Sequence, residues 1–284
     1  MTASLVAADG TPLAWYRWDP SGRTPRSVAV VVHGLGEHMG RHGPLVAHLV
    51  RAGISVAGAD LRGHGRSGGP RGHVARFDDY LDDLGLVVST ARQSPRGAPL
   101  WLVGHSLGAL IVLRLVERRR VPGLAGIVLS GIGIDPILPV PTWKRLLGRV
   151  GAWVAPRLPV DNGIRARMLS RDPAVQDRYG GDPLVHRVVT PGWYREFEAT
   201  RRDALAGAAR VSVPVLLVHG EADPIVSAEG SRRLAGALTG ADVTLRVYPG
   251  ARHEVFTDPG CAGALADVER WMLDVERRRL RRAS

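Results

Sequence analysis

The sequence has a single cysteine, Cys261, a single lysine, Lys144, and only three phenylalanines among its 284 residues. With one cysteine, no disulfide can form within the chain, and a shortage of cysteine is typical of proteins from a reducing compartment. Cys261 lies at the predicted start of a helix, where we expect a small packing residue rather than a nucleophile. We therefore expect a cytoplasmic protein that is stabilised by its core.

Targeting and membrane-spanning segments are also missing. The first residues contain no basic region followed by an apolar stretch, so they do not resemble a signal peptide. No run reaches the roughly 18 apolar residues that a bilayer-crossing helix needs. The hydrophobic fraction of 45% is ordinary for a globular protein, and the length suits one large α/β domain.

Positive charge is abundant: the formal net charge is +11, and nearly all of it is arginine because Lys144 is the only lysine. Strong basicity is typical of proteins that bind nucleic acids or anionic membranes. The arginines are scattered, however, and no zinc, helix-turn-helix or RNA-binding signature accompanies them. The densest run, at 277–282, falls at the end of a predicted helix, where cations suit the helix dipole and contact solvent. We therefore expect no nucleic-acid partner.

Short apolar runs alternate with helical patterns along most of the chain. Continuous apolar strands separated by helices are typical of a parallel sheet covered on both faces. The pattern therefore predicts the α/β fold class, with a mostly parallel sheet flanked by helices. The predicted strands are residues 28–32, 54–59, 100–103, 127–129, 215–218 and 245–247, and the predicted helices are residues 77–92, 107–117, 228–238 and 262–279. Residues 5–7 and 13–18 are predicted to form an antiparallel hairpin that joins the sheet.

The alternation stops in residues 131–209. This stretch is rich in proline and tryptophan, and it contains no strand-like run of comparable strength. We interpret it as an inserted helical cap over the sheet. The core is then predicted to consist of residues 1–130 and 210–284.

Two segments match the pattern Gly-x-Ser-x-Gly, at 65–69 and 104–108. In a nucleophile elbow, a strand must precede the motif and a helix must follow it, so that the tight turn lifts the serine hydroxyl above the sheet. A predicted strand directly precedes Ser106 and a predicted helix directly follows it. The copy with Ser67 runs into Gly-Pro-Arg-Gly, which cannot open a regular helix. We therefore predict Ser106 as a nucleophile and Ser67 as a loop serine.

A serine nucleophile needs a base, and the base needs an acid that orients it. After an elbow of this kind, the acid precedes the histidine in the chain. His186 falls in the predicted cap, whereas His253 lies between the last predicted strand and the last predicted helix, where the base is expected. The acid should follow the strand that ends at His219. Asp223 fits this place, and Glu221 is the runner-up, for which a solvated surface role is expected.

The oxyanion of a tetrahedral intermediate needs N–H donors. One expected donor is the backbone N–H of Leu107, directly after the nucleophile. The loop after the strand at 28–32 reads His33-Gly-Leu-Gly-Glu-His38, and its glycines let the main chain turn towards the elbow. We therefore predict the backbone N–H of Leu35 as the second donor.

Two histidines of this region could suggest a metal site. His38 and His42 stand four residues apart, a spacing that some metal sites use. No third ligand has a matching spacing, and the pattern His-Glu-x-x-His is absent. The sequence therefore predicts no metal and no organic cofactor.

Six motifs carry a resemblance over nearly the whole chain. They are His33-Gly-Leu-Gly-Glu-His38, Asp60-Leu-Arg-Gly-His-Gly-Arg-Ser67, Gly104-His-Ser-Leu-Gly108, Asp182-Pro-Leu-Val185, His219-Gly-Glu-Ala-Asp223 and Tyr248-Pro-Gly-Ala-Arg-His253. With these motifs in this order, the sequence resembles the monoacylglycerol lipase and lysophospholipase group of the α/β-hydrolase superfamily. The resemblance implies an α/β-hydrolase fold with a cap, a catalytic triad and a lipid or acyl-ester substrate. It is less specific for the substrate, because the same motifs serve related esterases.

One predicted cap helix has an apolar stripe. The stripe consists of Trp143, Leu146, Leu147, Val150, Trp153 and Val154, with Lys144, Arg145 and Arg149 off it. An apolar stripe normally packs against its own protein. A basic helix with tryptophan on its apolar face can also rest on a membrane interface, and the resemblance implies a cap that admits lipid. Two interpretations therefore stay open: internal packing, or substrate entry with peripheral contact to an anionic membrane.

The expected activity is hydrolysis of single-chain acyl esters by way of an acyl-enzyme on Ser106. Monoacylglycerol, split into fatty acid and glycerol, is the first expected substrate, and lysophospholipid is the second. A small ester, a lactone or a peptide N-terminus would be the substrate of a broader hydrolase. An inert ligand-binding protein on the same fold is the non-enzyme alternative, but all three residues of the predicted triad are present. The sequence carries no indication of the oligomeric state.

Overall fold

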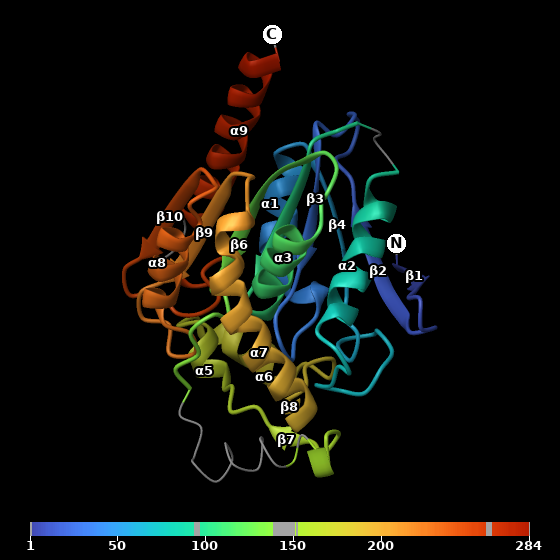
Figure 1. The fold of residues 1–284 in the computed structure, drawn as a ribbon. Coiled ribbons are helices and arrows are strands. Elements are labelled where there is room, and N and C mark those ends of the chain that lie inside the picture. Colours follow the sequence, from blue (N-terminus) through green and yellow to red (C-terminus); the bar gives the residue numbers. More distant parts are fainter. Residues whose placement is uncertain (1, 94–96, 139–150, 152, 260–262, 284) are drawn as a thin grey trace.

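One mixed sheet of eight strands forms the centre of the molecule (Figure 1). This computed structural model describes residues 2–93, 97–138, 151, 153–259 and 263–283. The strands of the sheet are β1 (Thr2–Val6), β2 (Pro12–Trp18), β3 (Ser27–Val32), β4 (Ile54–Ala59), β5 (Leu100–His105), β6 (Leu124–Ser130), β9 (Val215–Gly220) and β10 (Val243–Tyr248). Their order in space is β1-β2-β4-β3-β5-β6-β9-β10. The two pairings of β2 are antiparallel, and all other pairings in the sheet are parallel.

The sheet confirms the predicted α/β class. Each of the six predicted strands is present, and the predicted N-terminal hairpin is the antiparallel pair β1 and β2. The predicted helices are also present, as α2 (Asp78–Ala91), α3 (Leu107–Arg118), α8 (Ala228–Ala237) and α9 (Ala264–Ala283). The predicted helix start at 262 lies outside the described part of the chain, as does Cys261.

Helices cover both faces of the sheet. Successive residues of a strand point to opposite faces, so each strand contributes side chains to both layers of packing. In β3, Val28, Val30 and Val32 belong to the core cluster that includes α2 and α3, as the α8 residue Leu234 does. The intervening residues Ala29 and Val31 pack instead with α1 (Gly43–Arg51) and α9. Helix α1 was not predicted. It begins directly after a short 3-10 helix (Met39–His42) with a proline in its first turn, so its pattern is too short to stand out.

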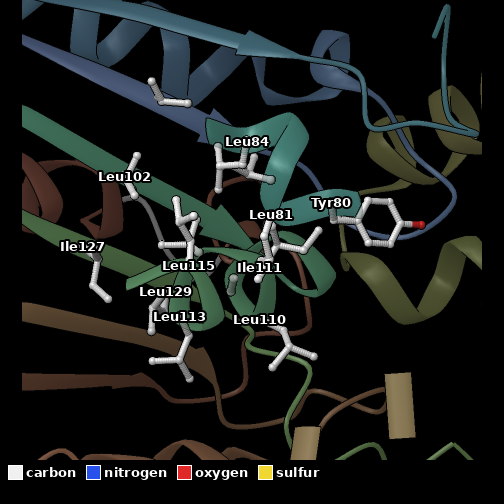
Figure 2. Packing of buried hydrophobic residues seen from close by; sticks show 14 of the residues in the cluster. Tyr80, Leu81, Leu84, Leu102, Leu110, Ile111, Leu113, Leu115, Ile127 and Leu129 are labelled. Carbon is white, nitrogen blue, oxygen red and sulfur yellow. The ribbon is translucent and has the colours of Figure 1, made fainter. Parts of the chain in front are cut away.

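The larger core cluster fixes the place of α3. Figure 2 shows Ile111 of α3 close to Leu81 of α2, and Leu113 and Leu115 of α3 on the side of the strand residue Leu129. These side chains are almost fully buried, and each contributes roughly 1.5–3 kcal/mol by leaving water. Burial of this kind holds the start of α3 close to the carboxyl end of β5.

The segment between β6 and β9 lies beyond the carboxyl ends of the parallel strands, at the bottom of Figure 1. It contains β7 (Val160–Asp161), α5 (Ala166–Leu169), α6 (Pro173–Gly181), β8 (Val188–Val189), α7 (Pro191–Gly207) and the short 3-10 helix Ala208–Arg210. Strands β7 and β8 pair with each other, and two residues each are too few to give a readable strand pattern. The C-terminus of α9 lies at the opposite end of the molecule (Figure 1).

Only part of the predicted apolar stripe can be placed. Trp143, Leu146, Leu147 and Val150 lie outside the described residues, as do the three basic residues beside them. Trp153 and Val154 are described, and their exposed fractions are 80% and 79%. Among the residues that the structure describes, no helix is both long enough and apolar enough to cross a bilayer.

Candidate active site

Ser106 sits on the turn that joins β5 to α3. Its backbone angles are φ 53° and ψ −114°, and in the described part of the chain it is the one non-glycine residue with a positive φ. Such a conformation costs energy, and it persists where the surrounding structure enforces it, typically at functional sites. The sharp strand-turn-helix geometry is that of a nucleophile elbow.

The two glycines of the motif, Gly104 and Gly108, allow neighbouring backbone segments to approach each other closely at this turn. A Cβ on Gly104 would lie 2.6 Å from the backbone nitrogen of Ala109 in α3. A Cβ on Gly108 would lie 2.5 Å from the carbonyl oxygen of His33. Any side chain at either position would therefore push α3 away from the strands that hold Ser106.

His253 and Asp223 form a buried pair. His253 Nδ1 lies 2.6 Å from Asp223 Oδ2, although the two residues are 30 positions apart in the sequence. The other carboxylate oxygen of Asp223 accepts hydrogen bonds from the backbone N–H groups of Ile225 (2.8 Å) and Val226 (3.1 Å). These bonds fix the carboxylate, which leaves Oδ2 to orient the imidazole. Glu221, the runner-up acid, is exposed.

The His253 ring lies beside the elbow. A Cβ on Gly131 would stand 3.1 Å from His253 Cε1, and the residue before it, Ser130, accepts a hydrogen bond from the Ser106 N–H at 2.8 Å. The Ser106 hydroxyl makes no hydrogen bond to the residues that the structure describes. Catalytic hydrogen bonds are often long without substrate and tighten in the Michaelis complex.

The glycine loop, residues 33–38, also reaches the elbow. A Cβ on Gly34 would lie 3.1 Å from the Cβ of Ser106. Leu35 follows Gly34 directly, and Leu107 is the first residue of α3, where backbone N–H groups have no partner within the helix. The structure thus brings both segments that carry the predicted oxyanion donors next to Ser106.

Aromatic side chains of α7 lie close to the elbow. Gly133 donates its N–H to the Ser106 carbonyl at 3.2 Å, and a Cβ on Gly133 would be 3.4 Å from the ring of Phe197. Phe197 stacks on Trp193, with ring centroids 5.0 Å apart. This aromatic pair was not predicted from the sequence, because α7 has no distinct apolar pattern that would indicate its inner face.

A buried polar cluster lies behind the glycine loop. Glu37 accepts a hydrogen bond from the Gly34 N–H at 2.5 Å and lies 3.1 Å from His42 Nε2. Arg41 pairs with Glu37 and, at 2.6 Å, with Glu254. No role was predicted from the sequence for Glu37, Arg41 or Glu254, since charged residues in a loop normally suggest solvent contact. The signal that could have indicated a role is their position in the chain, because Glu37 lies two residues after Leu35 and Glu254 directly follows His253.

His105 and His219 complete the surroundings of the pair. The rings of His105 and His253 lie 4.8 Å apart. Burial, and then the neighbouring His253, lower the pKa of His105 to about 3, so this ring stays neutral. His219 is fully buried, and its Nε2 lies 3.3 Å from Asp223 Oδ2, while its Nδ1 bonds to Ser231 Oγ at 2.7 Å.

The electrostatics of the pair suit a base and its orienting acid. Burial alone would raise the pKa of Asp223, but the interactions with His253 and His219 outweigh burial and hold that pKa far below its ordinary value. Burial alone would lower the pKa of His253, but the Asp223 carboxylate outweighs it and raises that pKa. Asp223 therefore stays ionised when His253 gains a proton.

We expect the rate of hydrolysis to depend on pH through His253. The base must be neutral, so kcat/KM should rise with pH and be lost as the pH falls through the pKa of His253. Because that pKa is raised, the midpoint should lie above 6.5, the ordinary histidine value. A pH profile with a soluble ester measures it, and EDTA should leave the profile unchanged. A flat profile, or a midpoint near 4, would contradict the role of His253.

The other sequence candidates have structural partners. Ser67 is buried, donates its hydroxyl to the Asp60 carbonyl at 2.5 Å and accepts the Ala14 N–H at 2.9 Å. His38 lies 2.9 Å from Asp182, whereas His42 faces Glu37, so the two histidines have separate partners. Within the described residues, no three His, Cys, Asp or Glu side chains group closely enough to bind a metal ion.

Comparison with known proteins gives consistent matches. The family model described as "Serine aminopeptidase, S33" matches residues 23–260. Monoacylglycerol lipase from Mycolicibacterium smegmatis is 35% identical over 95% of this chain and 96% of its own. Phospholipase YtpA from Bacillus subtilis is 29% identical over 85% of this chain and 93% of its own. The crystal structure of Paleococcus ferrophilus monoacylglycerol lipase aligns with a TM-score of 0.83 and 33% identity, over 93% of this chain and 99% of that one.

Proposed function

The chain belongs to the Serine aminopeptidase, S33, family of α/β-hydrolases, and we propose that it hydrolyses single-chain acyl esters, with monoacylglycerol as its first substrate. It is a carboxylic ester hydrolase. The observation that carries the proposal is the buried His253–Asp223 pair at 2.6 Å beside the strained elbow of Ser106. The similarity to two monoacylglycerol lipases over almost their full length supports the choice of substrate.

In the proposed reaction, Ser106 Oγ attacks the ester carbonyl carbon while His253 Nε2 takes the hydroxyl proton. The backbone N–H groups of Leu35 and Leu107 stabilise the oxyanion that forms. Protonated His253 then gives its proton to the leaving glycerol oxygen, and an acyl-enzyme remains on Ser106. Water then attacks the acyl carbon while His253 takes its proton, and His253 returns that proton to Ser106 Oγ as the ester bond breaks and the fatty acid leaves. Asp223 holds the ring in the tautomer that this sequence of steps needs.

The apolar wall at Phe197 and Trp193 supports an acyl substrate. Phe197 is buried beside Gly133, which bonds to the Ser106 carbonyl, and Trp193 is buried in a stack on Phe197. An alkyl chain gains roughly 0.8 kcal/mol for each methylene that leaves water. We assign residues 131–209 to a cap that supplies this wall, with the core formed by residues 1–130 and 210–284.

A chain-length series tests the proposed substrate. Monoacylglycerols with acyl chains of roughly 2 to 18 carbons should show kcat/KM rising with acyl length until the apolar wall is filled. Aminoacyl p-nitroanilides, which an aminopeptidase would cleave, should be poor substrates. A preference for the anilides, or no rise with chain length, would refute a single-chain acyl ester as the substrate.

Lysophospholipid is the second candidate, and the similarity to phospholipase YtpA favours it. It carries one acyl chain, as monoacylglycerol does, so the same apolar wall would serve it. The two substrates differ in the charged phosphate head group. Matched acyl chains on glycerol and on glycerophosphocholine, assayed side by side, separate the two candidates by kcat/KM.

We further propose that the exposed stripe residues Trp153 and Val154 touch lipid, next to cationic Arg195. The Arg195 guanidinium lies 5.7 Å from the Trp153 ring centroid, and the ring is otherwise exposed. Tryptophan at an interface between water and apolar chains, with arginine beside it, is typical of peripheral membrane contact.

Replacing Trp153 with alanine is expected to weaken binding to anionic phosphatidylglycerol vesicles by about 5- to 30-fold. Withdrawal of one partly inserted aromatic ring changes the binding free energy by roughly 1–2 kcal/mol. Hydrolysis of a short soluble ester should not change. Leu280→Ala is the matched control, because Leu280 is also exposed, at 73%, but lies near the far end of α9. Equal vesicle binding by Trp153→Ala and the native protein would exclude the contact.

A further inference from the structure

The loop that carries His253 is bound to the cap on both sides of the histidine. The N–H of Glu254 donates to the Leu169 carbonyl at 2.8 Å. The guanidinium of Arg252 donates to the Arg167 carbonyl and, at 3.4 Å, to the Ser170 carbonyl. Both chain neighbours of His253 therefore contact one short stretch, residues 167–171, which we name the anchor segment.

The carboxylate of Asp258 also joins the anchor segment to this loop. Asp258 Oδ1 accepts hydrogen bonds from Arg171 Nε (3.0 Å) and Nη2 (2.7 Å). Its Oδ2 accepts from the backbone N–H of Arg171 at 3.0 Å and from that of Arg252 at 3.3 Å. Asp258 thus links the cap to the residue directly before His253.

The environment of Asp258 makes this link rigid. Its side chain has no exposed surface, whereas Arg171 is 41% exposed. Removing a carboxylate from water costs several kcal/mol, and only good pairing and hydrogen bonding offset that cost. The forked guanidinium contact supplies pairing with a defined orientation. A shift of Arg171 would take the guanidinium away from the buried Asp258 carboxylate, so we expect the two residues to move together.

His253 has little freedom to tolerate such a shift. It lies in an irregular loop after β10, outside any helix or strand, so tertiary bonds set its position. Its ring must keep the 2.6 Å contact with Asp223 while it lies against Gly131. Displacement of a catalytic group by about 1 Å can lower a rate by roughly 10²-fold.

We propose that Asp258 and Arg171 are positioning residues through which the cap sets the place of the catalytic base. This inference rests on the proposed function, in which His253 is that base. It assigns the cap a part in the chemistry of every substrate, including short soluble esters that need no apolar wall.

The test measures kcat, KM and the pH profile on a short p-nitrophenyl ester. Asp258→Ala should lower kcat by about 10²-fold with little change in KM. Asp258→Asn and Arg171→Gln should each lower it by roughly tenfold, and Arg171→Lys, which keeps the charge but not the fork, by less. The midpoint of the pH profile should fall in these variants, because a displaced His253 loses part of its contact with Asp223. The other titratable groups near His253, namely Glu254, Glu37 and His105, are unchanged in all of them.

Arg165→Gln is the matched control. Arg165 lies in the same part of the cap, and it pairs with Asp161 in an exposed contact that does not involve the His253 loop. Its kcat and pH midpoint should equal those of the native protein. A loss in Arg165→Gln as large as that in Arg171→Gln would overturn the proposal, because it would show a general effect of cap charge.

Thermal denaturation separates positioning from stability. A lower melting temperature with native kcat and native pH midpoint would overturn the inference, because Asp258 would then only stabilise the fold. If Asp258→Ala does not fold, Asp258→Asn and Arg171→Lys test the same inference, with smaller expected losses of kcat. His253→Ala is assayed alongside: if it keeps native activity, the proposed function fails, whereas if only the Asp258 and Arg171 variants are native-like, the positioning role alone fails.

Discussion

Replacing Ser106 or His253 with alanine is expected to lower kcat/KM for ester hydrolysis by about 10³-fold or more. Without Ser106 no acyl-enzyme can form, and without His253 nothing takes the proton from the hydroxyl. The double variant should be hardly worse than either single variant, because the residues act as one unit. Steady-state rates with a p-nitrophenyl ester measure the loss, and a fluorophosphonate should label native protein at Ser106.

Ser67→Ala is the control for this prediction, since Ser67 stands in the second Gly-x-Ser-x-Gly segment. Its hydroxyl bonds to the Asp60 carbonyl and the Ala14 N–H inside the core. Removing it leaves a buried N–H without a partner, which should lower the free energy of unfolding by roughly 1–3 kcal/mol. Folded Ser67→Ala should still react with the fluorophosphonate. Label on Ser67 in the native protein would show that the wrong elbow was chosen.

Replacing Asp223 with asparagine is expected to lower kcat by about 10³- to 10⁴-fold while the fold is kept. The amide oxygen can still accept the N–H groups of Ile225 and Val226. The amide nitrogen then faces His253 Nδ1 and donates to it, so the ring takes the wrong tautomer and cannot accept the Ser106 proton. The variant also cannot stabilise a protonated His253, and the pH midpoint of its residual activity should fall.

Glu221→Gln is the matched control for Asp223→Asn. Glu221 lies two residues earlier in the same loop, but it is exposed and was the runner-up for the acid. Its kcat should stay within about twofold of the native value, since exposed charges contribute little. A large loss in Glu221→Gln with a small loss in Asp223→Asn would reverse the assignment of the acid.

Chain order and periodicity were enough to predict the sheet and the three residues of the proposed triad. The apolar runs that became β3, β5 and β9 are buried on both faces, and such strands appear in a sequence as unbroken valine-rich segments. Ser106 could be separated from Ser67 because only one copy of the motif had a strand before it and a helix after it. His253 followed from the same local logic, since the loop after the last strand can hold only a few side chains above the sheet.

Side chains that meet from distant parts of the chain could not be predicted in this way. Arg171 and Asp258 are 87 residues apart, and Glu37 pairs with Arg41, which in turn reaches Glu254. In the sequence each is a polar residue in a loop, for which solvent contact is the ordinary expectation. Nothing in the local pattern indicates burial, because burial of a charge depends on whether a partner arrives from elsewhere in the fold.

Local sequence therefore determined which residues form strands and helices, and through the elbow and the loops after β9 and β10 it determined the candidate triad. Those features repeat with periods of 2 or 3.6 residues or follow from a turn of a few residues, so neighbouring positions carry the information. Only the tertiary structure decided how the cap joins the loop of His253, which buried carboxylates have partners, and that Trp153 faces solvent. These features depend on the packing of loops against one another, which no periodic pattern encodes.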